Sequence, residues 1–345
     1  MDMVKDKIRF IFRLPVIGCC FALLCFWAGC VQEDAFTVAK NPDLRCPLSV
    51  SNLRAAVAAG LTRAAGSDAI PAGELIGFYL KPDGDLYTTA LTNKVSIYDK
   101  VNSLWMPQGD TIWLYGVSAE VAIYYPYKSA VTNNLLPLTR ALRTDDKQDL
   151  WSIRFGANGG TATSSLILTQ VYSRLTLTFV QDPDAPYTGA ANMLGPTLTS
   201  PDLYPSGTFN VQDSTYAYSG TPSGFVPKSG TFAVKDTDPA ATDAVVFDIL
   251  LLPRATLTGD ITVSTTVDNK AMKVVIPKEK LSGALAPGKQ YKVTIVLKPK
   301  ALMVSSIYTT DWELYKTINT DANLDDKPVT RQSQLNKKVN ADETE

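Results

Sequence analysis

The sequence predicts an all-β protein made of two tandem β-sandwich domains with Greek-key connections. Apolar and polar residues alternate with period two in several runs, most clearly over residues 291–297. Turn-forming residues separate these runs, as at Pro287-Gly288 and Asp268-Asn269-Lys270. No stretch between residues 65 and 315 shows ten or more residues with helical periodicity. A chain of 345 residues is long enough for two such domains.

The composition excludes several classes of function. The chain contains no histidine, which removes imidazole acid–base catalysis, histidine-activated nucleophiles and histidine-containing zinc sites. A net charge of −1 gives no reason to expect a nucleic-acid partner. Aspartate-rich loops such as 182–184 lack the glycine-centred calcium loop, and Glu74 and Glu120 belong to no catalytic motif. We therefore expect no enzymatic activity, no cofactor and no metal site.

Residues 1–29 have the features of a signal peptide. Basic residues precede an apolar run over 14–28 that is short for a membrane span. The sequence Trp27-Ala28-Gly29-Cys30 resembles a bacterial lipobox, although Trp27 replaces the usual aliphatic residue. We expect Cys30 to be the first residue of the mature protein and to carry lipid, palmitate included. An ordinary signal peptide and an uncleaved membrane anchor are the alternatives.

Residues 30–50 are predicted to form a polar tether. The acidic group at 31–34 is similar to the export signal of surface-exposed lipoproteins, and a solvated linker is the alternative. Cys46 is the only cysteine after Cys30, so an internal disulfide is not expected. Residues 53–59 have high helix propensity and precede Gly60, a plausible C-cap, which favours a short helix here.

The first predicted domain covers residues 51–183 and the second covers 190–318. The boundary is placed at 181–187, where two prolines and two aspartates interrupt the periodicity. Residues from there to about 230 are expected to be mainly long surface loops with weak strands such as 214–218. The predicted strands outside these loops are 75–80, 86–91, 111–117, 121–127, 151–153, 165–180, 245–252, 261–267, 271–276, 291–297 and a final run from 302 to about 312.

Residues 319–345 are charged and poor in apolar side chains. We expect either a solvated tail or a donor segment that becomes a strand in a neighbouring molecule.

Five segments, by their order and spacing together, resemble the fimbrillin-like proteins of Bacteroides-type bacteria, the subunits of type V fimbriae. The resemblance covers nearly the whole mature chain, with Tyr172 where the family commonly has histidine. The segments are Ile76-Gly77-Phe78, 121–127, 172–175, 251–253 and 287–312.

This resemblance implies two transthyretin-like sandwiches and a lipoprotein precursor exported to the surface of the outer membrane. It also implies a structural and adhesive role in a fimbrium, with other subunits as partners by β-strand donation and a host or bacterial surface ligand. In the family, a protease cuts after arginine or lysine and removes the first strand. Arg63 is the expected cleavage site here, and Arg54 is the alternative. The resemblance therefore favours a strand over 48–60, against the helix that propensity favours, and both remain open.

A surface glycan-binding lipoprotein of a polysaccharide-uptake system is the alternative function. Aromatic side chains could stack on sugars, but the same residues also build β-sandwich cores, which we expect here. The aromatic residues concerned are Tyr79, Tyr87, Tyr98, Trp105, Trp113, Tyr124, Tyr125 and Tyr127.

Overall fold

The computed structural model describes residues 45–55, 70, 73–82, 87, 91–131, 133–159 and 165–312, which all fall within one compact unit. Nearly all regular structure in these residues is β, as predicted. The helices described are two short 3₁₀ turns, η1 (Asp146–Gln148) and η2 (Lys278–Leu281). Among the described residues, no helix has the length and apolar character needed to cross a membrane.

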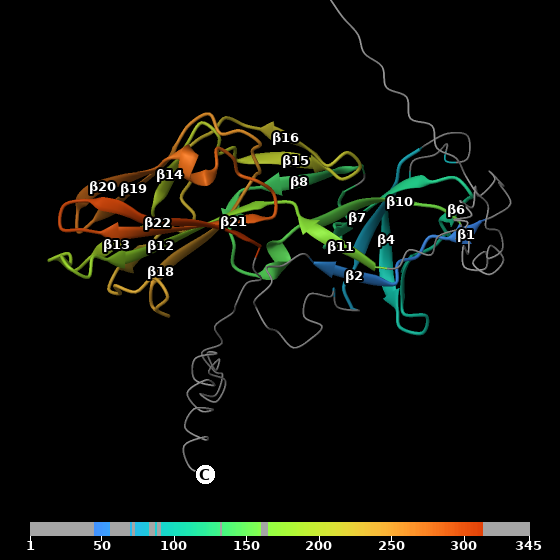
Figure 1. Ribbon diagram of the computed structural model, residues 1–345, viewed down its shortest axis with the longest axis horizontal. Helices are drawn as coiled ribbons and strands as arrows, with labels where there is room; N and C mark the ends of the chain where they lie inside the picture. Colours follow the sequence, from blue (N-terminus) through green and yellow to red (C-terminus); the bar gives the residue numbers. More distant parts are fainter. Residues whose placement is uncertain are drawn as a thin grey trace, which may run out of the picture. The chain divides into compact units, whose positions relative to one another are not determined.

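The largest sheet has seven strands, which come from chain segments far apart in sequence (Figure 1). Its order is β2 (Asn52–Ala55), β11 (Ser165–Gln170), β10 (Trp151–Ala157), β7 (Ala119–Tyr125), β3 (Ile76–Leu80), β4 (Leu91–Asp99) and β5 (Leu104–Pro107).

Close packing within this sheet explains one glycine. A Cβ atom on Gly77 of β3 would lie 1.9 Å from a ring carbon of Tyr124, its partner in β7. The Tyr124 ring is fully buried, and its hydroxyl donates a hydrogen bond of 2.6 Å to the side chain of Asn93. The ring is therefore held over the backbone at Gly77, where a larger side chain would displace it.

Two further sheets form a sandwich, here called the second sandwich. One has the order β22 (Leu302–Asp311), β21 (Lys289–Leu297), β12 (Ser173–Gln181), β18 (Val245–Leu251) and β9 (Ala141–Leu142). The other has β14 (Thr197–Thr199), β19 (Ile261–Val267), β13 (Asn192–Leu194) and β17 (Thr231–Ala233), with β20 (Lys270–Ile276) paired to β19. Their inward side chains, including Leu177, Ile249, Val263 and Ile276, form one cluster, here called the second core.

Two small sheets complete the described fold. β16 (Thr215–Ser219), β15 (Ser206–Asn210) and β8 (Leu135–Thr139) form one, and β1 (Cys46–Pro47) with β6 (Trp113–Leu114) forms the other. Side chains of β8 and β15 pack with those of the seven-stranded sheet in another cluster, here called the first core because it contains the N-terminal strands. Trp312, at the end of the described chain, also belongs to the first core.

Two predicted hairpins are confirmed. β19 and β20 pair along their whole length around Asp268 and Asn269, whose φ angles of 44° and 66° are those of a two-residue hairpin turn. β21 and β22 also pair along their length, and in the turn between them the Lys298 N–H donates a hydrogen bond of 2.9 Å to the Ala301 carbonyl. The alternation of apolar residues over 291–297 thus identified a half-buried strand.

The predicted division at 183–190 does not separate the sheets. β12 was expected in the first domain, yet it lies between β18 and β21, paired antiparallel to the former and parallel to the latter. The two cores are not consecutive in sequence, because Tyr172 belongs to the first core and Leu175 to the second, and the chain returns to the first core at Phe209 and Trp312. A period of two identifies the buried face of a strand but not its partner strands.

The expectation of mainly long surface loops up to residue 230 was also wrong. β13, β14, β15, β16 and β17 all lie between residues 192 and 233. Phe209 of β15 and Val211 after it are buried in the first core. These strands are short and rich in serine and threonine, so few apolar residues reveal their alternation.

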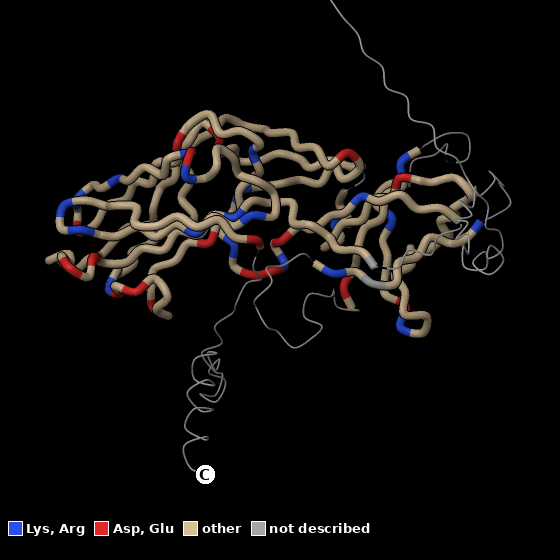
Figure 2. The backbone as a smooth tube through the Cα atoms, viewed as in Figure 1, with Lys and Arg blue, Asp and Glu red and all other residues tan. Residues whose placement is uncertain are grey.

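Charged residues lie singly or in short groups along the described chain, with long uncharged stretches between them (Figure 2). Electrostatic effects are therefore local and depend on particular pairs.

Candidate assembly site

The N-terminal segment, defined as residues 45–55, contacts the rest of the fold along its length. In β1, Cys46 pairs with Leu114 and Pro47 pairs with Trp113 of β6. The guanidinium of Arg45 lies 4.8 Å from the centre of the Trp113 ring, within the range of a cation–π contact.

The N-terminal segment then reaches both edges of the seven-stranded sheet. Val50 exchanges two hydrogen bonds, of 2.8 and 3.1 Å, with Trp105 of the edge strand β5. Directly afterwards β2 pairs in parallel with β11 at the opposite edge, with Leu53 in register with Leu166. One continuous piece of backbone thus bridges the two ends of the sheet.

This path requires the sheet to curl. Three residues, from Val50 to Leu53, span at most about 10 Å of extended chain. In a flat sheet, β11 and β5 would be separated by five interstrand steps, which amount to about 24 Å. The N-terminal segment therefore closes a strongly curved sheet, and each of its two contacts covers an edge that would otherwise be unpaired.

The side chains of the N-terminal segment are part of the first core. Leu48, Val50 and Leu53 are 1%, 0% and 2% exposed. The Leu48 N–H donates a hydrogen bond of 2.8 Å to the carbonyl of Ile112. The Leu53 carbonyl accepts one of 3.2 Å from the N–H of Ile70. Burial at this level means that the segment is an integral layer of the fold.

Cys46 is a free, partly buried thiol beside a group of polar contacts. Its sulfur lies 4.0 Å from the carbonyl oxygen of Asn158. The nearby Tyr87 hydroxyl donates to the Val117 carbonyl at 3.1 Å and accepts from the Tyr115 N–H at 2.7 Å. Burial raises the pKa of Tyr87, so its hydroxyl stays protonated and keeps donating.

The structure describes one of the two arginines considered as cleavage sites, Arg54, and the strand that contains it. Residues 52–55 form a strand, as the family resemblance implied, and the helix that propensity favoured is wrong there. Arg54 lies within β2 in register with Ile167, and its side chain is exposed. Cys30, Arg63 and the tail 319–345 lie outside the described residues.

A buried ionic network lies where the described chain ends, and the sequence analysis did not find it. Trp312 follows β22, and its indole N–H donates to an Asp149 carboxylate oxygen at 3.1 Å. The Arg143 side chain donates two hydrogen bonds of 2.7 Å to the same carboxylate and lies 3.4 Å from Asp248. Arg174 donates two more, of 2.6 Å, to Asp248.

This network joins elements of both cores. Asp149 follows η1, whereas Arg174 and Asp248 lie on β12 and β18 of the second sandwich. Burial opposes the charge on Arg143, but hydrogen bonds and charge attraction from Asp149, together with Asp248, hold its pKa above the usual value. Burial raises the pKa of Asp149, and its hydrogen bonds with Arg143 and Trp312 act in the opposite direction. The network ties Trp312, the last described residue, to elements of both cores.

Most of the aromatic residues considered for sugar stacking are in the first core. Tyr79, Tyr87, Trp105 and Tyr124 are at most 4% exposed, and Trp113, at 39%, is the only exposed residue among the eight. The expectation that these residues build the core is confirmed for these four. They form no exposed aromatic platform for a saccharide.

The chain belongs to the fimbrillin-like family, whose model matches residues 62–312. This assignment confirms the resemblance inferred from the sequence. The N-terminal segment precedes the matched region.

Solved structures of two Bacteroides proteins are similar to this chain. A candidate cell adhesion protein from Bacteroides uniformis has a TM-score of 0.53 and 18% identity, covering 78% of this chain and 100% of its own. A second candidate from Bacteroides ovatus has a TM-score of 0.52 and 18% identity, covering 79% and 99%. Both likenesses indicate a shared fold. No curated protein matches the chain.

Proposed function

We propose that this protein is a structural and adhesive subunit of a cell-surface fimbria, in which a partner's strand replaces the N-terminal segment. Membership of the fimbrillin-like family supports the fimbrial role. The observation that carries the strand-exchange model is the path of the N-terminal segment, which covers two edges of one sheet through Trp105 and β11. Its removal would unpair both edges at once.

The energetics favour replacement over a permanent gap. Burial of Leu48, Val50 and Leu53 contributes on the order of 5 to 9 kcal/mol, at about 1.5–3 kcal/mol for each side chain. That is comparable to the whole stability of a typical domain. A subunit that loses the segment therefore gains strongly from an incoming strand with apolar side chains at matching positions.

The direction of β2 adds to this preference. β2 pairs with β11 in parallel. Parallel pairing is slightly less stable per residue than antiparallel pairing. A donor strand that ran antiparallel to β11 would form the stronger ladder, so exchange would be favoured even when the donor side chains merely equalled those removed. The donor we propose is the tail 319–345 of a neighbouring subunit.

Export and processing complete the model. The precursor is carried to the outer membrane as a lipoprotein anchored through Cys30, and a protease cuts after Arg63. Such a cut would release the lipid and the whole N-terminal segment together. Arg54 is the poorer site, because its backbone is paired in β2 and proteases act on extended, unpaired chain.

The test incubates the purified precursor with an arginine-specific protease and follows polymer formation by electron microscopy and by gels run without boiling. N-terminal sequencing of the product identifies the cut. We expect cleavage after Arg63 and polymers from the unaltered protein and from Arg54→Ala, with neither from Arg63→Ala. Polymerisation of Arg63→Ala at the normal rate, with Cys30 still attached, would exclude this model.

Anchoring is tested separately with Cys30→Ser. Stable attachment requires more than one acyl chain, so loss of the lipidated cysteine should abolish membrane retention. We expect the variant to remain uncleaved or to leave the detergent phase on phase partitioning. Recovery of Cys30→Ser in the detergent phase at the mature mass would show that the anchor lies elsewhere.

A further inference from the structure

A strip of hydroxyl groups lies on the outer face of the second sandwich. Along β14 and β19 the apolar side chains, such as Leu198 and Val263, point into the second core, and the alternate residues point outward. All the outward residues are threonine or serine, and they are cross-strand partners where the strands pair. They are Thr197 opposite Ser264, Thr199 opposite Thr262, and Thr266 beyond them.

These five hydroxyl groups are available for a ligand. Within the part of the chain that the structure describes, none of the five takes part in a side-chain hydrogen bond. By contrast, the hydroxyl of the inward-facing Thr265 donates to the carbonyl of Leu194 at 2.5 Å. Each free hydroxyl offers one donor and two acceptor positions.

A fixed wall of chain, residues 222–230, stands beside this strip. Leu198 and Phe225 exchange two backbone hydrogen bonds of 2.8 and 2.9 Å, which hold the wall against β14. Farther along, the N–H of Gly195 donates to the carbonyl of Gly230 at 2.9 Å. The wall is therefore attached to the sheet at both ends of the strip.

The side chain of Arg140 holds the wall in place at Ser223 and Phe225. Its side chain is largely buried and donates to the Leu203 carbonyl at 2.6 Å and to the Ser223 carbonyl at 3.0 Å. It also donates to the Ser223 hydroxyl at 3.1 Å, and its guanidinium lies 4.9 Å from the Phe225 ring. A side chain with four separate contacts leaves the wall little freedom to move.

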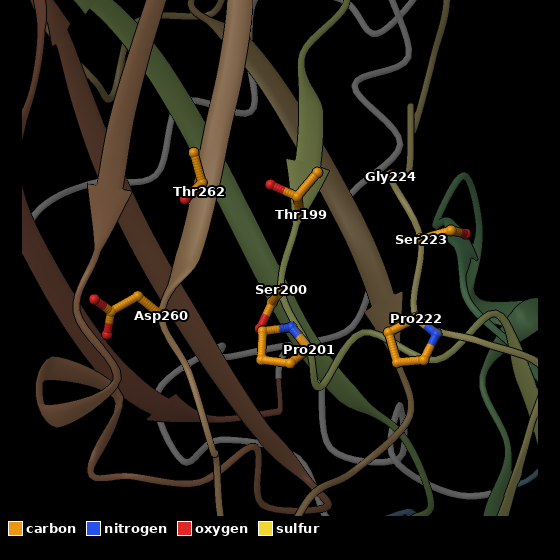
Figure 3. A pocket seen from close by; sticks show the side chains of 8 residues that line it. All are labelled: Thr199, Ser200, Pro201, Pro222, Ser223, Gly224, Asp260 and Thr262. Atoms are coloured by element: carbon orange, nitrogen blue, oxygen red, sulfur yellow. The ribbon is translucent and has the colours of Figure 1, made fainter.

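The outer surface is hollowed twice along the strip. One hollow, of about 410 Å³, is lined by Thr199, Thr262 and Asp260 on one side and by 222–224 on the other (Figure 3). The second, of about 570 Å³, includes Ser264, Thr266 and Lys273 of β20. Each volume is in the range of small-molecule sites. All five residues of the hydroxyl strip line one hollow or the other, and the wall borders only the first hollow. The two hollows are here together called the trough.

We propose that this trough binds a neutral oligosaccharide, with adjacent sugar units in the two hollows. A row of uncommitted hydroxyls, with a carboxylate at one hollow and an ammonium at the other, can donate to and accept from the hydroxyls of a sugar chain. The floor belongs to two paired strands and the wall is held in place, so binding requires little ordering of the protein. No aromatic side chain lines either hollow, so recognition depends on hydrogen bonds.

The test is independent of strand exchange because it uses the unpolymerised full-length protein. The probe is an array of defined neutral oligosaccharides, with their sialylated counterparts on the same surface, and affinities are then measured by isothermal titration calorimetry. The variant Thr199→Val/Thr262→Val removes two floor hydroxyls with almost no change in shape. The matched control is Thr178→Val/Thr294→Val, a register pair on the outer face of the other sheet.

We expect binding to at least one neutral oligosaccharide, weakened about tenfold or more by Thr199→Val/Thr262→Val. The control should bind as the unaltered protein does. A second variant, Ser264→Trp, fills the other hollow and should abolish binding, with the melting temperature showing that all variants fold. The proposal is overturned if no neutral oligosaccharide binds, if only sialylated ones do, or if both trough variants bind unchanged.

Discussion

The two cores differ in how the chain closes them. The second core lies between two sheets whose strands come almost wholly from residues 173–311, apart from the short β9. The first core depends on the N-terminal segment, which covers both edges of the seven-stranded sheet through Val50 and β2. Removal of one terminal segment can therefore open the first core.

This difference suggests a division of roles. A sheet closed by a detachable segment is suited to exchange, because a partner can supply the missing layer. A sandwich closed by its own hairpins, such as β19–β20, keeps its outer surface unchanged while exchange takes place. The proposed saccharide trough lies on that second sandwich, so binding and assembly would use separate parts of the molecule.

The largest effect should come from deletion of residues 31–63, which removes the N-terminal segment entirely. The loss of three buried side chains, on the order of 5 to 9 kcal/mol, should open the first core. Hydrogen exchange measured by mass spectrometry should show loss of protection at Trp105 and along β11. The β19–β20 hairpin should keep its protection. Loss of protection in both places would mean that the two cores unfold as one unit.

The next largest effect concerns the ionic network that joins the two cores. Arg143→Leu leaves the buried carboxylate of Asp149 without its cationic partner, whereas Asp248 keeps Arg174, and the loss should cost about 3–5 kcal/mol. Urea unfolding measures the change in free energy. The matched control is Lys289→Ala, which removes an exposed pair with Asp311 and should cost at most about 1 kcal/mol. Equal effects of the two substitutions would show that burial does not set the strength of this network.

Leu53→Ala should loosen the N-terminal segment without removing it. The side chain is 2% exposed, and truncation of a buried leucine typically costs about 2–5 kcal/mol. Cleavage after Arg54 by an arginine-specific protease should become faster, because β2 detaches from β11 more often. Leu198→Ala in the second core should lower overall stability by a similar amount but leave the cleavage rate unchanged. A faster cut in Leu198→Ala would link the second core to the release of the segment.

The strands with strong alternation could be predicted from the sequence, and their partners could not. Residues 261–276 have both a period of two and an Asp-Asn turn, so the hairpin follows from local rules. The position of β12 between β18 and β21 depends on pairing across long stretches of chain, which no local pattern encodes. For residues 52–55, pairing with β11 and burial of Leu53 override a helix propensity worth only tenths of a kcal/mol per residue.

Some candidate sites could likewise be predicted from the sequence, and others could be found only in the structure. Cys30 and Arg63 were predicted from short motifs, and both lie outside the described residues, so they remain predictions. The ionic network could not have been found from spacing, because Arg143 and Asp248 are separated by 105 positions. The hydroxyl strip is visible in the sequence only as alternate threonines and serines. Its partner loop, 222–230, becomes apparent only when the backbone contacts to β14 are known.

The smallest effect should come from Glu120, an exposed carboxylate on β7 of the seven-stranded sheet. It lies 3.1 Å from Lys81 and 3.2 Å from Arg154. The hydrogen bond from Lys81 is the main cause of its lowered pKa, and the charges of Lys81 and Arg154 add to it. All three side chains are about 40% exposed, so solvent screens the pairs, and Glu120→Gln should cost less than about 1 kcal/mol at pH 7.

The pH dependence gives this small effect a definite sign. A carboxylate whose pKa is lower in the folded state than in the unfolded state stabilises the fold fully above its unfolded pKa of about 4.3. That contribution disappears as the pH falls through the folded pKa. The stability difference between the unaltered protein and Glu120→Gln, measured by urea unfolding, should therefore be present at pH 7 and shrink towards pH 3. It should also decrease in 1 M salt, which screens exposed pairs. A difference that is unchanged by either pH or salt would mean that Glu120 stabilises the sheet through packing of its side chain and not through its charge.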